Sequence, residues 1–410
     1  MRVTPVLSAA LFLSAVSVAL AKPPGNSVRD YGAKGDGKAD DTASFQEAID
    51  SIAKSGGGVL SVPRGNYLIK THLTVREHVV LEGVFKAPTA RSEMKGSTLL
   101  AVESKGGLEG EPFITLLANA CLKGITVFYP EQSQTTPKPY PWTVRGIGDN
   151  CTIKDCLFTN PYAAVDFGTY PAGRHYINGL YAQAIYRGVF VDKCFDVGRL
   201  ENVHLWPFWT EKLMDWTLKN GEAFTIARTD WEYMTNCFCI SYKTGFHFLG
   251  KADGPGNAIL TQCGSDVGDV AVQVDALQGH AGASFLNGQF MGEIRVAPAN
   301  TGPLKFTACG FWGVAGRTET YGILEGHGQT SFSNCHFTAW DQKTNGAPAI
   351  HAVNGGLSVM GCDFMDAGLN QIVLEKGVEA ATIVGNRFRG GQKMTNNSNG
   401  SVEIGLNAKG

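Results

Sequence analysis

The chain has 410 residues, of which 43% are hydrophobic and 18% are charged, and this balance excludes an intrinsically disordered protein. The net charge of −2, without a basic patch, argues against a nucleic acid as partner. Glycine accounts for 51 residues but follows no three-residue period, which excludes collagen and favours a fold with many tight turns.

The first 21 residues have the three parts of a secretory signal peptide. Arg2 is the basic start, residues 6–18 are apolar, and Ala19-Leu20-Ala21 is a small-residue cleavage site. The apolar stretch is shorter than the ~18 residues that a membrane span requires. We therefore expect residues 1–21 to be removed and the mature chain to be secreted, extracellular or periplasmic, without a membrane partner.

The mature chain begins with a motif, residues 27–69, that predicts one helix and two strands. Asp41 or Thr42 is a suitable N-cap, and the run Gly56-Gly57-Gly58 ends the helix. Between them, apolar residues recur on one helical face: Phe45, Ala48, Ile49, Ile52 and Ala53. The expected strands are residues 59–62 and 67–69.

The same motif resembles the start of the rhamnogalacturonase/epimerase-like pectate-lyase superfamily. The matching runs are V-R-D-Y-G-A-K-G-D-G-K-A-D-D-T at residues 28–42 and G-G-G-V-L-S-V-P-R-G-N-Y at residues 56–67. The resemblance implies an all-β protein, a single-stranded right-handed parallel β-helix with this helix covering its N-terminal end. We interpret Asp36, Asp40 and Asp41 as turn and cap residues rather than a metal site. One domain, residues 22–410, is expected.

A repeat in the sequence independently predicts a solenoid. Short strands end in a small or thiol residue close before an aromatic one, and the clearest copies are at Cys156, Cys309, Cys335, Cys362 and Asn386. The last four follow at intervals of 24 to 27 residues. Thiols stacked on successive coils are usually packing residues. The ten cysteines are therefore expected to be mainly buried and free, although the sequence leaves open whether any of them forms a disulfide.

A second series of strands is aligned in the same coils, with side chains that alternate between the core and the surface. The residues predicted to point inward are Val165, Val189, Phe246, Val272, Ile294, Ile323, Ile350 and Ile372. The row predicted to point outward is Asp166, Phe190, Thr225, His247, Gln273, Arg295, Leu324, His351 and Val373. A shift of one position would bury Asp166.

Solenoid geometry limits which carboxylates act together. Strands of neighbouring coils lie about 5 Å apart, a spacing that suits the two carboxylates of a retaining glycosidase. Asp166 and Asp192 belong to neighbouring coils and are the predicted catalytic pair. His247, the best-placed outward histidine, is the third catalytic candidate. The structural alternative for Asp192 is that it starts a turn before Cys194.

The aromatic and charged stretch from residue 160 to residue 216 favours a sugar-binding cleft, because aromatic rings stack on pyranose faces and charged groups bind hydroxyls. Insertions at residues 129–143 and 206–220 are expected to wall this cleft. The predicted substrate-binding residues are Arg174, His175, Arg199, His204, Trp206, Trp209, Glu211 and Asp215. For the arginines and histidines, holding turns together is the alternative interpretation.

The known catalytic motifs of related enzymes are mostly absent. Polygalacturonases carry N-T-D, D-D, G-H-G and R-I-K, of which the chain has only Gly326-His327-Gly328 and the Asp40-Asp41 pair of the N-terminal motif. The Y-G-x-D-P-H run of alginate epimerases is also absent.

The first interpretation is therefore a secreted protein that binds a polysaccharide or oligosaccharide and hydrolyses a glycosidic bond with an Asp pair. A lyase or epimerase acting on uronic-acid polymers is the second, and a non-catalytic carbohydrate-binding protein is the third. No metal or cofactor is expected, except Ca²⁺ if the protein is a lyase. Neither the sugar, the linkage nor the oligomeric state follows from the sequence.

Overall fold

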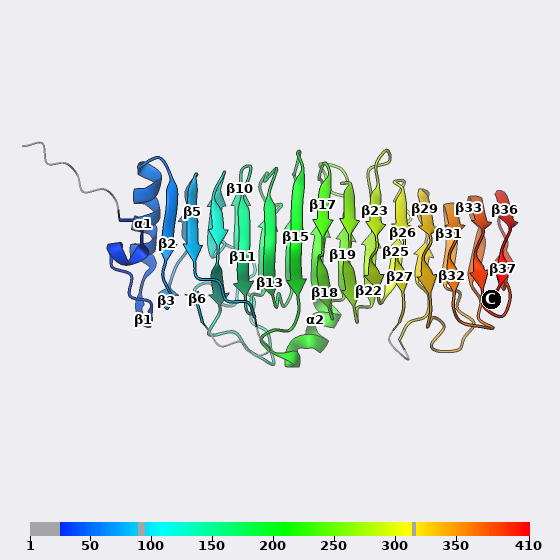
Figure 1. Ribbon diagram of the computed structural model, residues 1–410, viewed down its shortest axis with the longest axis horizontal. Coiled ribbons are helices and arrows are strands. Elements are labelled where there is room, and N and C mark those ends of the chain that lie inside the picture. Colours follow the sequence, from blue (N-terminus) through cyan, green and yellow to red (C-terminus); the bar gives the residue numbers. More distant parts are fainter. Residues whose placement is uncertain (1–24, 89–94, 314–316) are drawn as a thin grey trace, which may run out of the picture.

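The computed structural model describes residues 25–88, 95–313 and 317–410, so the predicted signal peptide lies outside the described residues. The chain winds into a long stack of coils (Figure 1). Strands of successive coils pair in parallel and form three ladders that run the length of the stack. This arrangement confirms the predicted right-handed parallel β-helix.

The three ladders contain every strand of the described residues. The first consists of β4 (Leu73–Val75), β7 (Ile114–Leu117), β10 (Trp142–Ile147), β12 (Ala163–Phe167), β14 (Arg187–Val191), β16 (Glu222–Ile226), β19 (Thr244–Phe248), β22 (Val270–Val274), β25 (Glu293–Val296), β28 (Gly322–Leu324), the starts of β31 (Ile350–Met360) and β33 (Ile372–Val384), and β35 (Met394–Asn396). The second consists of β2 (Gly58–Val62), β5 (Val79–Gly83), β8 (Cys121–Lys123), β11 (Thr152–Phe158), β13 (Tyr176–Ala182), β15 (Gly198–Leu205), β17 (Glu232–Thr235), β20 (Ala258–Thr261), β23 (Ala283–Leu286), β26 (Leu304–Thr307), β29 (Gln329–Ser333), the ends of β31 and β33, and β36 (Ser401–Gly405). The third consists of β1 (Asp36–Asp40), β3 (Gly65–Ile69), β6 (Ser97–Ala101), β9 (Ile125–Phe128), the ends of β11, β13 and β15, β18 (Phe238–Ile240), β21 (Gly264–Asp266), β24 (Gln289–Phe290), β27 (Gly310–Phe311), β30 (His336–Phe337), β32 (Asp363–Phe364), β34 (Arg387–Phe388) and β37 (Ala408–Lys409).

The helix expected near the N-terminus is α1 (Thr42–Lys54), preceded by the short η1 (Val28–Tyr31). Its apolar face packs on β2, β4 and β5, and Figure 1 shows α1 at the N-terminal end of the stack. The acidic residues around it bind backbone amides, but Asp41, at the N-cap position, makes no side-chain capping hydrogen bond to the helix. Asp36 accepts from the amides of Lys38 and Ala39, and Asp41 accepts from those of Lys34 and Gly35.

The core consists of like side chains stacked on successive coils. Phe311, Phe337, Phe364 and Phe388 lie ring on ring, with centroids 4.8 to 5.0 Å apart, and each such pair adds about 0.5–1.5 kcal/mol beyond its buried area. All ten cysteines lie in the described part and are free, which confirms the expectation of unpaired thiols. Burial raises the pKa of Cys156 to about 12, so this thiol stays protonated.

The outward row of the first ladder is confirmed from Asp166 to Arg295, because each residue pairs in register with the next. The coil that contains β28 departs from the predicted row by one residue. Ile323 pairs with Arg295 and His351, whereas Leu324 pairs with Val296 and is 3% exposed. The prediction was wrong there because Gly322, which has no side chain, takes the preceding inward position opposite Ile294.

The insertion at residues 206–220 forms the short η2 (Glu211–Leu213) and α2 (Met214–Asn220), which protrude from the stack in Figure 1. No helix in the described ranges combines the length and apolarity that crossing a bilayer requires.

Candidate functional site

A cleft of about 220 Å³ lies over the first ladder, where β14, β16 and β19 follow one another. Its polar and aromatic lining consists of Trp142, Arg187, Phe190, Glu222, Thr225 and Lys251. Phe190 and Thr225 belong to the predicted outward row, and Trp142 comes from the end of the Pro-rich insertion. Trp142 is also the first residue of β10, so the insertion reaches the cleft only at its junction with this strand.

Aromatic rings and cations form one side of the cleft. The rings of Trp142 and Phe190 are nearly parallel, 18° apart, with centroids 6.3 Å apart. The Arg187 guanidinium lies 5.9 Å from the Trp142 ring centre, and Lys251 Nζ lies 4.7 Å from that of Phe190. Trp142 itself is 7% exposed, so the half-buried Phe190 ring and the two cations are what the cleft offers to a sugar that bears a carboxylate.

The two cations differ in their partners. Lys251 forms an ion pair with Asp192 at 3.0 Å. Arg187 stacks on Trp142 and Tyr186, and no carboxylate within the described ranges forms an ion pair with it. Its guanidinium, which presents a planar fork of donors, therefore remains available for a bidentate contact with an anionic ligand.

His247 connects two carboxylates beside the cleft. Its Nε2 lies 3.0 Å from Asp275 Oδ2, and its Nδ1 lies 3.4 Å from Glu222 Oε1. The second contact is an ion pair without a hydrogen bond, and Nδ1 is a buried atom that has no hydrogen-bond partner. Glu222 and Asp275 are more exposed, at 36% and 41% of their side chains. Of the predicted catalytic residues, His247 is therefore the one that the structure places at this site.

These contacts shift the pKa values of the group. Burial acts to lower the pKa of His247, but the contacts with Glu222 and Asp275 raise it above its ordinary value of 6.5. The contact with His247 lowers the pKa of Glu222, although burial opposes this effect. Glu222 is thus an ionised carboxylate at neutral pH, suited to accept a proton rather than to donate one.

Asp166 points to the outward side of β12 by register but is fully buried. Its Oδ2 accepts from Arg145 Nε at 2.6 Å, and its Oδ1 accepts from the amides of Gly168 and Thr169. The prediction of an exposed catalytic carboxylate at this position is wrong, because Arg145 on the preceding coil covers and neutralises it.

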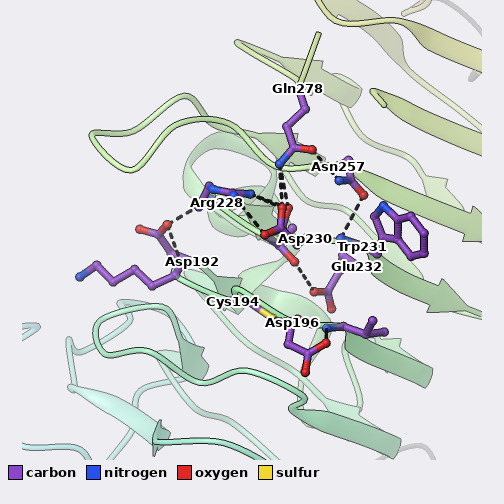
Figure 2. A network of polar contacts seen from close by, with 12 residues as sticks. Asp192, Cys194, Asp196, Arg228, Asp230, Trp231, Glu232, Asn257 and Gln278 are labelled. Carbon is purple, nitrogen blue, oxygen red and sulfur yellow. Dashed lines mark hydrogen bonds and ion pairs between the residues drawn. The ribbon is translucent and has the colours of Figure 1, made fainter. Parts of the chain in front are cut away.

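Asp192 is also buried, with 1% of the residue exposed. It accepts from the amides of Lys193 and Arg228, and Figure 2 shows the bond to Arg228. The bond to Lys193 fits the interpretation of Asp192 as a turn residue, and the bond to Arg228 also ties it to the next coil. Asp166 pairs in register with Phe190, not with Asp192, and the expected exposed pair of aspartates is not formed. Asp192 still contributes to the cleft by holding Lys251.

The predicted substrate-binding cations lie at a different corner, where the chain enters the second ladder. Arg174 is exposed and forms ion pairs with Asp149 and Asp196, which fits the structural alternative. His175 is fully buried and lies 3.0 Å from Glu232. Arg199 is exposed on β15. None of these three lines the cleft.

The predicted aromatic insertion supports the cleft from behind instead of lining it. Trp216 packs edge-on against Tyr186, on which Arg187 stacks. His204 lies among Tyr181, Phe208 and Phe238, and burial lowers its pKa. The remaining predicted residues, Trp206, Trp209, Glu211 and Asp215, belong to the insertion and are absent from the lining. A sugar-binding role for them stays a prediction without a place in this cleft.

Sequence reasoning missed Arg187, Glu222, Lys251 and Asp275. The strand alignment could have found the first two, because Arg187 and Glu222 begin β14 and β16 of the first ladder and pair with each other in register. Lys251 and Asp275 lie beyond the ends of β19 and β22, where the two-residue alternation of a strand no longer predicts which way a side chain points.

Within the described ranges, one group of three potential metal ligands lies close together, His175, Cys194 and Glu232, and it is away from the cleft.

Comparisons with known proteins agree with the fold. Residues 26–176 match the family described as rhamnogalacturonase A/epimerase, pectate lyase-like, which confirms the predicted resemblance. The A-module of the mannuronan C-5 epimerase AlgE6 of Azotobacter vinelandii superimposes with a TM-score of 0.58 and 14% identity, over 94% of this chain and 99% of that one. At this identity, the likeness establishes the fold alone.

Two curated relatives share short, more similar segments. Alginate lyase 7 of Azotobacter vinelandii is 55% identical over 42 residues, which are 10% of this chain and 5% of that protein. Plasmin and fibronectin-binding protein A of Streptococcus pneumoniae is 47% identical over 57 residues, 14% of this chain and 8% of that protein. The matched part of this chain thus spans less than a tenth of either relative.

Proposed function

We propose that this pectate-lyase-like β-helix is a carbohydrate-active enzyme that acts on an acidic polysaccharide in the cleft over β14, β16 and β19. The observation that carries this proposal is the position of Arg187, which has no ion-pair partner in the described part of the chain, beside an ionised Glu222 and the Trp142 ring. A cation without a partner, an aromatic face and a carboxylate are what binding and deprotonating a uronate unit require.

The proposed reaction begins with loss of the proton next to the uronate carboxylate. Arg187 and Lys251 bind that carboxylate and stabilise the negative charge that develops on it. Glu222, which lines the cleft, accepts the proton, and His247 holds Glu222 and Asp275 in position. Return of a proton from water to the opposite face inverts the carbon, whereas breaking the C–O bond to the neighbouring glycosidic oxygen leaves a carbon–carbon double bond and cleaves the chain, with water supplying the proton to that oxygen.

The names of two similar proteins support this substrate class. One is an alginate lyase and the other a mannuronan C-5 epimerase, so both names refer to uronate polymers. The match over residues 26–176 to a family that includes epimerases in its description points in the same direction.

Hydrolysis of a glycosidic bond is the second candidate. It is favoured by the two carboxylates, Glu222 and Asp275, that flank His247. A glycosidase needs one carboxyl group that is protonated at the working pH and one that is ionised, and the lowered pKa of Glu222 fits it to the second role only. We rank hydrolysis below proton abstraction, in reverse of the order expected from the sequence, because Arg187 and Lys251 line the cleft beside Glu222 and favour a substrate that bears a carboxylate.

Product analysis on a panel of polymannuronate, polyguluronate, polygalacturonate and a neutral glucan distinguishes these candidates. Inverted sugar units detected by NMR indicate epimerisation, ultraviolet absorbance of unsaturated ends indicates elimination, and new reducing ends alone indicate hydrolysis. Binding without any product on the whole panel would refute an enzyme and leave the non-catalytic alternative.

Substitutions locate the activity within the molecule. Glu222→Gln should lower kcat by about 100-fold or more, the usual effect of losing an acid–base group, and Arg187→Ala should raise KM for acidic polymers. The matched control is Glu375→Gln, because Glu375 makes a similar contact with His351 at 3.1 Å on a coil outside the cleft. Equal losses in Glu222→Gln and Glu375→Gln would contradict the assignment.

We also propose that the chain is secreted after cleavage behind Ala21. N-terminal sequencing of the mature protein should then begin at Lys22, and a retained N-terminus would contradict this expectation.

A further inference from the structure

Three side chains with metal-binding atoms meet inside the solenoid, away from the cleft. They are His175, Cys194 and Glu232, all of them fully buried, and one ligand atom from each lies within 4.8 Å of the others. The three residues come from successive coils: His175 precedes β13, Cys194 follows β14, and Glu232 begins β17. Figure 2 shows Cys194 and Glu232 among the polar residues of this corner.

A glycine makes room for the cluster. Gly198 pairs in register with Glu232, and the next residue, Arg199, pairs with Tyr176, the neighbour of His175. In the stack Gly198 therefore lies between the histidine and the glutamate. A Cβ at this position would lie 2.2 Å from Glu232 Oε2 and 2.5 Å from His175 Nε2. Only glycine lets the two side chains reach each other across the middle coil.

The histidine is oriented as metal-binding histidines usually are. Its Nδ1 lies 2.8 Å from the carbonyl oxygen of Ala172, and a hydrogen on Nδ1 leaves the lone pair of Nε2 directed into the cluster. Nε2 lies 3.0 Å from Glu232 Oε1. Glu232 is itself held by a hydrogen bond that Thr229 Oγ1 donates to its Oε2, a second contact of the kind that supports metal ligands.

The backbone on the glutamate side is also strained. Trp231 adopts a φ of 66°, in the left-handed region that bulky residues avoid, while its side chain is 55% exposed. This conformation turns Trp231 outward and Glu232 inward. Asp230, on the other side of Trp231, is fixed by two contacts with Arg228, shown in Figure 2.

We propose that His175, Cys194 and Glu232 form a structural site for a divalent transition metal of the Zn²⁺ class. An imidazole nitrogen, a thiolate and a carboxylate are the ligand types that zinc prefers, and tetrahedral bonds of about 2.0–2.3 Å place such atoms roughly 3.5 Å apart. The carbonyl oxygen of Asp196, 2.6 Å from Cys194 Sγ, offers a further oxygen at the same place. The metal would bind as the coils stack, because no ligand side chain reaches solvent.

Metal content is the direct test, and it is independent of the proposed function. The full-length chain is expressed in minimal medium with added Zn²⁺ or, separately, Co²⁺, and the purified protein is analysed by mass spectrometry for metals and by absorbance. The expected result is about one ion per chain and, for the Co²⁺ form, a near-ultraviolet cobalt–thiolate band. Wild-type protein with less than a tenth of an ion per chain and no such band would overturn the proposal and leave a metal-free histidine–glutamate ion pair.

Variants assign the metal to this cluster. Cys194→Ser should lose the cobalt–thiolate band, and His175→Gln should lose most of the metal, with folding checked by circular dichroism. The control is Cys309→Ser, because Cys309 is a buried thiol whose Sγ donates to the backbone of Phe285, outside the cluster. A band that persists in Cys194→Ser, or that disappears in Cys309→Ser, would place the metal elsewhere and refute the site.

Discussion

Replacement of Asp166 by asparagine separates a structural from a catalytic role. Asp166 has no exposed surface, and its partner Arg145 is 14% exposed, with 2.6 Å between Oδ2 and Nε. Asparagine keeps an oxygen that accepts from the amides of Gly168 and Thr169 at 2.9 and 2.8 Å. The substitution therefore removes the negative charge and the acceptor of the Arg145 hydrogen bond, because an NH2 group takes the place of Oδ2.

Breaking a buried ion pair by neutralising one partner typically costs 3–5 kcal/mol, because the other charge remains uncompensated. Arg145 retains some contact with water, so we expect a loss near the lower end, about 3 kcal/mol in the free energy of unfolding. Urea denaturation followed by tryptophan fluorescence measures this loss, and kcat on an acidic polysaccharide is measured at a temperature where the variant is folded. Unchanged stability together with lost activity would refute the structural reading of Asp166. The control is Arg174→Gln, whose ion pairs are exposed and whose removal should leave the unfolding midpoint unchanged.

Three further predictions concern pH, thiols and the core. Folding raises the pKa of His247 above 6.5 and lowers that of Glu222 below 4.5. The stabilisation from His247 is therefore complete below pH 6.5 and is lost as pH rises through its folded pKa. The stabilisation from Glu222 is lost in the opposite direction, as pH falls below 4.5. The urea midpoints of wild type and His247→Gln should therefore differ most near pH 5 to 6 and converge at alkaline pH, and a constant difference would contradict this coupling. Thiol titration with a disulfide reagent should detect few reactive cysteines in the native protein and ten after unfolding. The reason is that burial raises the pKa of thiols such as Cys156. Full reactivity of the native protein would be inconsistent with this packing. Phe337→Ala should lower the free energy of unfolding by about 3–5 kcal/mol, because its ring stacks between two others, and a loss below about 1 kcal/mol would show that the ladder relaxes around the cavity.

Local sequence signals predicted the architecture well. The helix at residues 42–54 follows from apolar spacing and glycine termination, and both are properties of a short segment. The 24–27-residue repeat follows from stacking, because each coil buries the same kind of residue as its neighbours. The outward row from Asp166 to Arg295 followed from alternation alone, and it located His247 and Phe190 beside the cleft. The same alternation failed by one position at Leu324, where a glycine occupies an inward place that a pattern of large apolar residues cannot mark.

The identity of the site depended on the tertiary structure. Alternation shows that Asp166 leaves the core, but only the fold places Arg145, from the coil before it, over the carboxylate. The lining residues Trp142 and Arg187 begin strands and Lys251 lies in a loop, and their separation along the chain gives no indication that they meet. Local patterns are thus enough to predict the solenoid, its core and the outward row of the first ladder. Polar side chains of the site find partners on neighbouring coils, about 25 residues away in the sequence. The stacking of these coils therefore sets which charges are buried and which remain available for a substrate.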